Sequence, residues 1–104
     1  MYKLTFFVPL SHLQEVKEAV FAAGAGKIGN YDRCCWQTPG QGQFRPLPGS
    51  QPYLGQHGEV EVVEEYRVEM VCAEKNMQRV ISALKNAHPY EEPAYDVWKL
   101  DSGF

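Results

Sequence analysis

The stretch that decides the fold is EVEVVEEYRVEMVCA, residues 59–73, the longest run of strand-like sequence in this 104-residue chain. Its even-numbered positions are mostly apolar, from Val60 to Cys72, whereas its odd-numbered positions are mostly charged. Because successive side chains of a strand point to opposite faces, the run predicts a strand with one apolar and one charged face. It is longer than the usual strand of about 5–6 residues, so we expect part of it to extend beyond the body of the sheet.

Glu64 interrupts the apolar face of this strand. Strict alternation places its carboxylate beside Val62 and Tyr66, where burial would require an Arg or Tyr partner or a subunit interface. Alternatively, a β-bulge at residues 64–65 shifts the register and leaves the carboxylate outside. The sequence leaves both arrangements open.

Two other segments have the amphipathic spacing of helices. In the first, Ser11 and Gln14 form a capping-box pattern, and Gly24 follows the last apolar position. In the second, Asn76 is the expected N-cap, and Pro89 ends the helix just after His88. The apolar stripes that should face the core are Leu13, Val16, Ala19, Val20 and Ala23 in the first helix and Met77, Val80, Ile81 and Leu84 in the second.

Further strands are predicted at residues 2–8, 31–38 and 94–100, where alternation again has period 2. The resulting order, strand-helix-strand-strand-helix-strand, predicts an α+β, ferredoxin-like βαββαβ fold. Right-handed crossovers place both helices on one face of a four-stranded antiparallel sheet, and the middle hairpin is enlarged. The length leaves room for a single domain, residues 1–104.

The predicted sheet is apolar on both faces. We assign Phe7, Tyr95 and Val97 to the open face, and Trp98 to the face that the helices cover. Large apolar patches on an open sheet face usually mark a protein–protein contact. The sequence therefore predicts a homo-oligomer that buries this face.

Composition and charge exclude several classes of protein. The formal net charge is -3, and the ten Lys and Arg residues are scattered, which argues against nucleic-acid binding. No apolar run approaches the roughly 18 residues of a membrane span, and the N-terminus lacks the apolar core of a signal peptide, so we expect no membrane association. Three cysteines, an odd number, indicate a reduced, cytoplasmic chain.

The run NAHPYEEPAYD, residues 86–96, contains the candidate metal site. His88 lies close in sequence to Glu91 and Glu92, and imidazole and carboxylate are natural ligands of a divalent transition metal. Cys34 and His57 are weaker candidates, because no CxxC or HxxxH spacing accompanies them. Alternatively, His88 caps a helix C-terminus, the acidic side chains are solvated, and Cys34 is a structural thiol.

No catalytic motif is present, and we expect no catalytic residues. The serines lack a GxSxG context, and neither a GxxxxGK[ST] nor an HExxH sequence occurs. The run GAGKIG, residues 24–29, matches GxGxxG, but it follows a helix and precedes a strand. That order is wrong for a phosphate site at a helix N-terminus.

Residues 39–55 contain four of the nine Gly and four of the seven Pro residues. This stretch joins two strands that should pair. It also contains Phe44, Arg45, Tyr53 and Leu54, which a flexible tether would not need. We therefore expect an ordered or conditionally ordered hairpin excursion that uses these four residues for interaction, either by packing on a neighbouring subunit or by closing over a cleft.

Three separated runs together resemble a known module: GAGKIGNYDRCCW (24–36), GQGQFRPLPGSQPYLGQHGEVEVVEEYRVE (40–69) and ALKNAHPYEEPAYDV (83–97). They are similar to the insert domain of YqfO-type proteins, the NGG-one-interacting-factor-three-like family, and the resemblance covers about residues 2–100. The resemblance implies a fold like those of the PII signalling proteins and CutA, and it favours a trimer. In longer members the module is inserted into a metal-binding body whose ligands have no counterpart here, so no hydrolase activity is implied for this chain.

By the same resemblance, the first positions to test for metal or effector binding are His88, Glu91 and Glu92. Cys34 and His57 are weaker candidates. The nucleotide-contacting motif of PII is not recognisable. We expect a non-enzymatic, cytoplasmic oligomeric module that acts by binding a ligand, a divalent metal or a partner protein. The alternatives are a metal-dependent enzyme with a site between subunits and a purely structural oligomerisation module.

Overall fold

The computed structural model describes residues 1–104 and contains four strands and two helices in the order βαββαβ. Short 3₁₀ turns at Leu10–His12 and Glu74–Asn76 precede the two helices. The elements are β1 (Tyr2–Pro9), α1 (Leu13–Ala22), β2 (Trp36–Phe44), β3 (Glu61–Cys72), α2 (Met77–Ala87) and β4 (Tyr95–Lys99).

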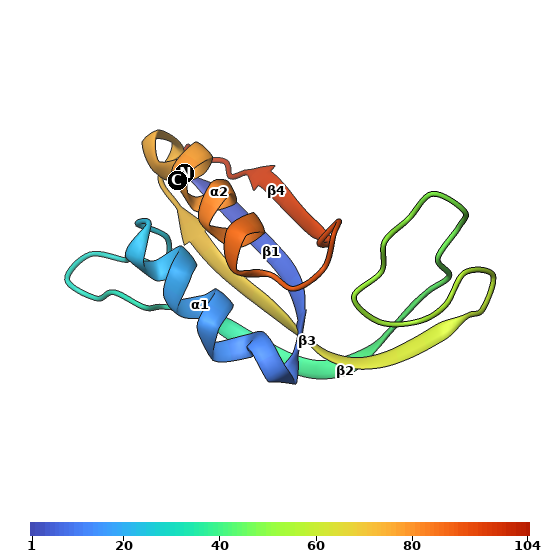
Figure 1. Ribbon diagram of the computed structural model, residues 1–104. Coiled ribbons are helices and arrows are strands. Elements are labelled where there is room, and N and C mark those ends of the chain that lie inside the picture. The colour runs from blue at the N-terminus through green and yellow to red at the C-terminus, as the bar shows by residue number, and fades with distance from the viewer.

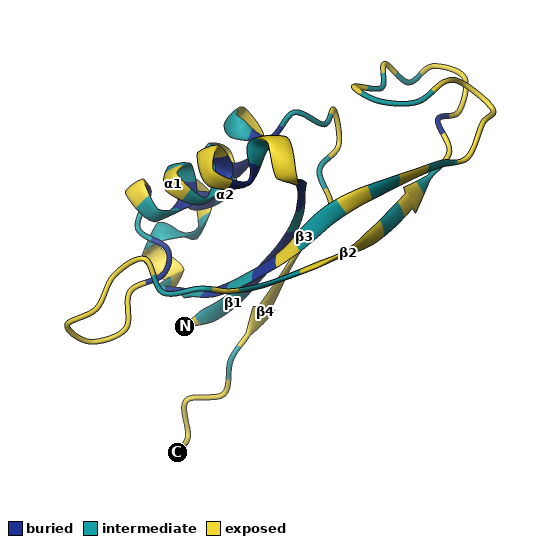
Figure 2. Cartoon of the chain, turned by 90° about the horizontal axis from the view of Figure 1, so that it is seen from below, coloured by how far each residue is buried: buried dark blue, intermediate teal, exposed yellow.

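The strands form one antiparallel sheet in the order β2-β3-β1-β4, and both helices pack on the same face of it (Figures 1 and 2). This is the ferredoxin-like arrangement that the sequence predicts, so the predicted fold class is confirmed. No helix reaches the length and apolar character needed to cross a bilayer.

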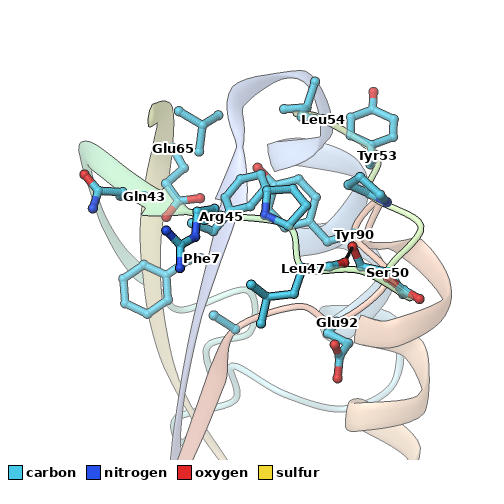
Figure 3. Close-up of a pocket in the computed structure, with 16 residues that line it drawn as sticks. Phe7, Gln43, Arg45, Leu47, Ser50, Tyr53, Leu54, Glu65, Tyr90 and Glu92 are labelled. Carbon is cyan, nitrogen blue, oxygen red and sulfur yellow. Dashed lines mark hydrogen bonds between the residues drawn. The ribbon is translucent and has the colours of Figure 1, made fainter. Parts of the chain in front are cut away.

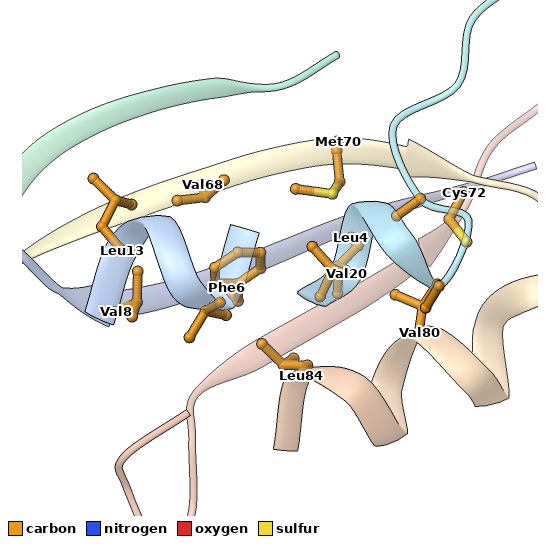
Figure 4. Packing of buried hydrophobic residues seen from close by; sticks show 13 residues of the cluster. Leu4, Phe6, Val8, Leu13, Val20, Val68, Met70, Cys72, Val80 and Leu84 are labelled. Atoms are coloured by element: carbon orange, nitrogen blue, oxygen red, sulfur yellow. The ribbon is translucent and has the colours of Figure 1, made fainter. Parts of the chain in front are cut away.

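The core lies between the helices and the two central strands (Figure 4). The even-numbered residues of the deciding stretch, Val68, Met70 and Cys72, are buried there, opposite Phe6, Leu4 and Tyr2 of β1. Each fully buried Leu, Val or Phe side chain contributes about 1.5–3 kcal/mol. The helices contribute the buried residues Leu13, Val16, Val20, Val80 and Leu84, all from the predicted stripes.

The predicted bounds of the second strand are wrong. Residues 31–35 form a loop in which Arg33 has a φ of 54°, and β2 instead runs to Phe44 through Pro39 and two glycines. Pro39 is tolerated because β2 is an edge strand, where a missing N–H need not interrupt a second ladder. Glycine is favoured at position 42 for a different reason: a Cβ there would overlap the carboxylate of Glu65.

The β2–β3 hairpin extends past the end of β1, as the length of the deciding stretch predicts. Pairing of β3 with β1 ends at Glu65, whereas pairing with β2 continues to Glu61 opposite Phe44. We call residues 41–44 and 61–64 the arm. Glu64 lies on the arm and is exposed, although the register has no bulge. Neither proposed arrangement is correct, because the helices do not extend over the arm and its even-numbered face meets solvent.

The helix starts also differ from the predictions. No capping box forms: a 3₁₀ turn precedes α1, and the Ser11 hydroxyl lies 2.8 Å from Nδ1 of His12. Asn76 occupies the N-cap position of α2, but its amide oxygen accepts a hydrogen bond from Arg79 at 2.8 Å rather than from the helix backbone. The predicted end of α1 is confirmed, since Gly24 follows it with a φ of 116°.

The open face is mixed rather than apolar, and the assignment of β4 residues to faces is reversed. Tyr95 pairs with Phe6, and Val97 with Leu4, so both lie on the helix-covered side, whereas Trp98 lies on the open side. Both faces of β4 carry apolar residues, so its pattern alone does not fix its register. Trp36 and Trp98 are 60% and 59% exposed on opposite edges of the open face. Between them, Glu69 pairs with Lys3 at 3.8 Å and with Arg67 at 2.8 Å.

Candidate functional site

The 45–60 loop, which joins β2 to β3, is held together by hydrogen bonds within itself. The Gly58 N–H donates to the Pro46 carbonyl at 2.8 Å, and the Ser50 hydroxyl donates to the Leu47 carbonyl at 2.7 Å. The imidazole Nε2 of His57 lies 2.8 Å from the Ser50 carbonyl. Because these bonds cross the loop, it is an ordered excursion, as its aromatic content predicts, and not a flexible tether.

The loop folds back against the 88–94 segment that leads into β4. The backbone N–H of Gln51 donates to the Glu91 carboxylate at 3.0 Å. The Tyr53 ring lies 5.8 Å from the His12 ring and 6.2 Å from the Tyr90 ring, and the Phe44 ring lies 6.1 Å from the Tyr90 ring. Within one chain, therefore, the loop closes over a cleft, one of the two arrangements that the sequence predicts.

The pocket under the loop has a volume of about 380 Å³ and lies between the loop, the arm and the 88–94 segment (Figure 3). This volume falls within the range of about 300–1,000 Å³ that is usual for small-molecule sites. All four predicted interaction residues, Phe44, Arg45, Tyr53 and Leu54, line the pocket.

Glu65 contributes a half-buried carboxylate to the pocket. It makes no hydrogen bond or ion pair within the chain, and burial raises the pKa of its carboxyl group. Alternation along β3 suggested a buried role for Glu64, whereas Glu65, whose side chain projects to the opposite face of β3, was not predicted. The available signal was Gly42 on the neighbouring strand, which leaves space for the Glu65 carboxylate.

Tyr90, which also lines the pocket, has a buried hydroxyl. The hydroxyl has no hydrogen-bond partner in the chain. Burial raises the pKa of the Tyr90 phenol, and the Glu65 carboxylate and Tyr53 add to this rise. A buried polar group without a partner costs about 1–3 kcal/mol, so the pocket contains a polar group that is not satisfied by the protein itself.

His88 fixes the position of Tyr90. The Tyr90 backbone N–H donates to Nδ1 of His88 at 3.1 Å, so the other nitrogen, Nε2, carries the proton and donates to the Phe7 carbonyl at 2.7 Å. The two rings are 4.9 Å apart. Burial lowers the pKa of His88, despite the opposing effect of the bond to Phe7. A neutral imidazole thus connects β1 to the wall of the pocket.

The structure does not assemble the predicted metal ligands within one chain. Both nitrogens of His88 are hydrogen-bonded, the Glu91 carboxylate accepts from Gln51, and Glu92 is exposed. Cys34 lies on the loop between α1 and β2, at the opposite end of the molecule from His57 (Figure 1). No group of three or more His, Cys, Asp or Glu side chains is arranged to hold a metal ion. A metal site thus stays a prediction that needs ligands from a second chain.

Comparison with known proteins identifies relatives of this chain. No family model matches it. It is 45% identical over 100 residues to the GTP cyclohydrolase 1 type 2 homolog of Halalkalibacterium halodurans, covering 96% of this chain and 27% of that protein. The crystal structure of a Bacillus cereus protein related to NIF3 superimposes with a TM-score of 0.84 at 44% identity, over 97% of this chain and 26% of that one.

The fold extends to more distant proteins. The periplasmic divalent cation tolerance protein CutA from Archaeoglobus fulgidus superimposes with a TM-score of 0.70 at 15% identity, over 100% of this chain and 88% of that one. This likeness shows a shared fold. The predicted resemblance to NIF3-type proteins and the CutA/PII-like fold are therefore confirmed, and the chain spans about a quarter of the length of the curated relatives it matches.

Proposed function

We propose that this chain, a CutA/PII-like module similar over nearly its whole length to part of the GTP cyclohydrolase 1 type 2 homologs, is a non-enzymatic binding module that takes up a small effector under the 45–60 loop. The observation that carries this proposal is the pocket itself. It joins three distant segments of the chain, and it contains the carboxylate of Glu65 and the hydroxyl of Tyr90, neither of which has a partner in the protein.

The polar groups of the pocket support binding rather than catalysis. Ser50 lines the pocket, but its hydroxyl donates to Leu47, and His57 contacts the carbonyl of Ser50 and not its hydroxyl. A nucleophile needs a general base within hydrogen-bond reach, and this serine has none. The name that the longer relatives carry describes whole proteins about four times as long as the matched segment, and we do not extend that activity to this chain.

The proposal includes a homo-oligomer, with a trimer favoured by the resemblance to PII and CutA. Its support in this structure is the exposure of Trp36 and Trp98 on the open face, since exposed tryptophans are typical of protein–protein contacts. Light scattering coupled to size-exclusion chromatography should therefore give a mass above 11.8 kDa. A monomer at micromolar concentration would contradict the proposed homo-oligomer.

Effector binding is tested by amide NMR spectra recorded with a fragment panel of neutral, anionic and cationic compounds. We expect at least one class to shift the amide signals of Arg45, Tyr53 and Tyr90 together, because these residues line the pocket from the loop and from the 88–94 segment. A panel that shifts none of them, or that shifts only residues remote from the pocket, would refute effector binding.

A further inference from the structure

The pocket is acidic. The charged residues that line it are Glu65, Glu91, Glu92 and Arg45, which gives three negative charges and one positive charge, a net charge of -2. Arg45 is exposed and makes no ion pair, so it does not neutralise the carboxylate of Glu65. An anionic ligand would meet this unfavourable field, whereas a cation would be attracted by it.

The walls of the pocket are aromatic. Phe44, Tyr53 and Tyr90 come from the end of β2, the loop and the 88–94 segment, and their rings lie in a row with Tyr90 in the middle. Aromatic faces attract cations, and planar guanidinium-like groups also stack on them. The aromatic walls and the negative charge of the pocket thus both favour a cationic ligand.

One open hydrogen-bonding group faces the pocket, the Glu65 carboxylate, which accepts hydrogen bonds only. The Tyr90 hydroxyl also lacks a partner, but it is closed off from solvent. A planar cation with several N–H groups donates to both oxygens of the carboxylate at once, and it supplies the positive charge that a partly desolvated carboxylate lacks. A neutral ring would leave that carboxylate without a counter-charge.

We propose that the pocket binds a small planar organic cation of the guanidinium or amidinium type, with its N–H groups on the Glu65 carboxylate and its plane against the aromatic walls. This inference rests on the proposed function, since it names the ligand class of the same pocket. Gly42 is part of the arrangement, because its missing side chain leaves room for the Glu65 carboxylate.

The test uses three compounds of almost identical shape: benzamidine, which is a planar cation, benzamide, which is neutral, and benzoate, which is an anion. Each is titrated to about 10 mM while amide NMR signals are followed, a range suited to fragments of this size. We expect benzamidine to shift the signals of Tyr53 and Tyr90 with a dissociation constant of about 1 mM or below, and to bind at least about tenfold more tightly than either control.

Variants assign the contacts. Glu65→Gln should weaken benzamidine binding about tenfold or more, because a hydrogen bond to an ionised group is lost. The matched control is Glu64→Gln, which removes the same charge from the neighbouring residue of β3, an exposed position outside the pocket, and should change binding less than about twofold. Arg45→Gln should strengthen binding, because it removes the only positive charge that lines the pocket. Amide spectra of each free variant verify that it is folded.

Equal effects of Glu65→Gln and Glu64→Gln would overturn the assigned contact, and weaker binding in Arg45→Gln would overturn the cationic ligand class. If benzamide or benzoate binds best, effector binding stands and the cation inference is wrong. If none of the three compounds shifts the pocket signals, the cation inference is also wrong, and the fragment panel then decides separately whether the pocket binds any effector.

Discussion

Replacing His88 by alanine should destabilise the fold far more than an ordinary surface change. The imidazole is buried, and it is the hydrogen-bond partner of both the Phe7 carbonyl and the Tyr90 N–H. Each group left without a partner costs about 1–3 kcal/mol, so the expected loss is about 2–4 kcal/mol. That is a large part of the total stability of about 5–10 kcal/mol for a chain of this size.

The assay is urea and thermal unfolding followed by circular dichroism, in which His88→Ala should lower the midpoint temperature by roughly 10–20 °C. His57→Ala is the control. Like His88, His57 contacts a backbone carbonyl through Nε2, that of Ser50 at 2.8 Å, but it is exposed on the loop. It should cost less than about 0.5 kcal/mol. A loss below about 1 kcal/mol for His88→Ala, or equal losses in both variants, would refute the connecting role of His88.

Four further predictions follow from the same region. The folded-state pKa of His88 lies below its ordinary value of 6.5, so the unfolded chain binds a proton at this residue more readily than the folded chain does. The free energy of unfolding should therefore be full above about pH 6.5 and fall as the pH drops towards the folded-state pKa. Urea titrations should show that His88→Gln flattens this dependence. Tyr90→Phe removes an unpartnered buried hydroxyl, so the ligand-free protein should be as stable or up to about 1 kcal/mol more stable; a loss greater than 1 kcal/mol would reveal a hidden partner. Gly42→Val should displace the Glu65 carboxylate, seen as a return of its pKa towards the ordinary value by carboxyl NMR titration, and an unchanged titration would argue against the close contact. Because both His88 nitrogens are hydrogen-bonded, calorimetric titrations with Zn(II), Cu(II) and Mn(II) should give the same result for the parent and His88→Gln, and a loss of binding in the variant would make His88 a ligand.

The sequence predicted most of the fold because its main signals are local. Alternation in residues 59–73 fixed the long strand, and helical spacing identified the buried stripes of both helices. The bounds of β2 were missed because Pro39 and the glycines beside it usually end strands, and only the position of β2 at the sheet edge makes them acceptable.

The candidate site was less predictable because it depends on non-local contacts. His88 was singled out correctly as a position of interest, but its main partner is Phe7, at the other end of the chain. Glu65 was missed because its setting is created by the arm, and alternation alone favoured attention to Glu64. The loop residues were predicted to interact because aromatic side chains among Gly and Pro residues are unusual. That they line a pocket could not be predicted, because the segments that form it come together only in the folded chain.

The central position of β1 determines when the sheet can close. Tyr2 lies opposite Cys72 on one side and Lys99 on the other, so β1 must wait for both residues 61–72 and residues 95–99 before it is paired on both sides. Contacts this distant in sequence carry a high loop-closure entropy, and they slow folding relative to helical proteins of similar length. During synthesis one side of β1 therefore stays unpaired until residues 95–99 have emerged, and an unpaired strand edge is prone to aggregation until β4 docks.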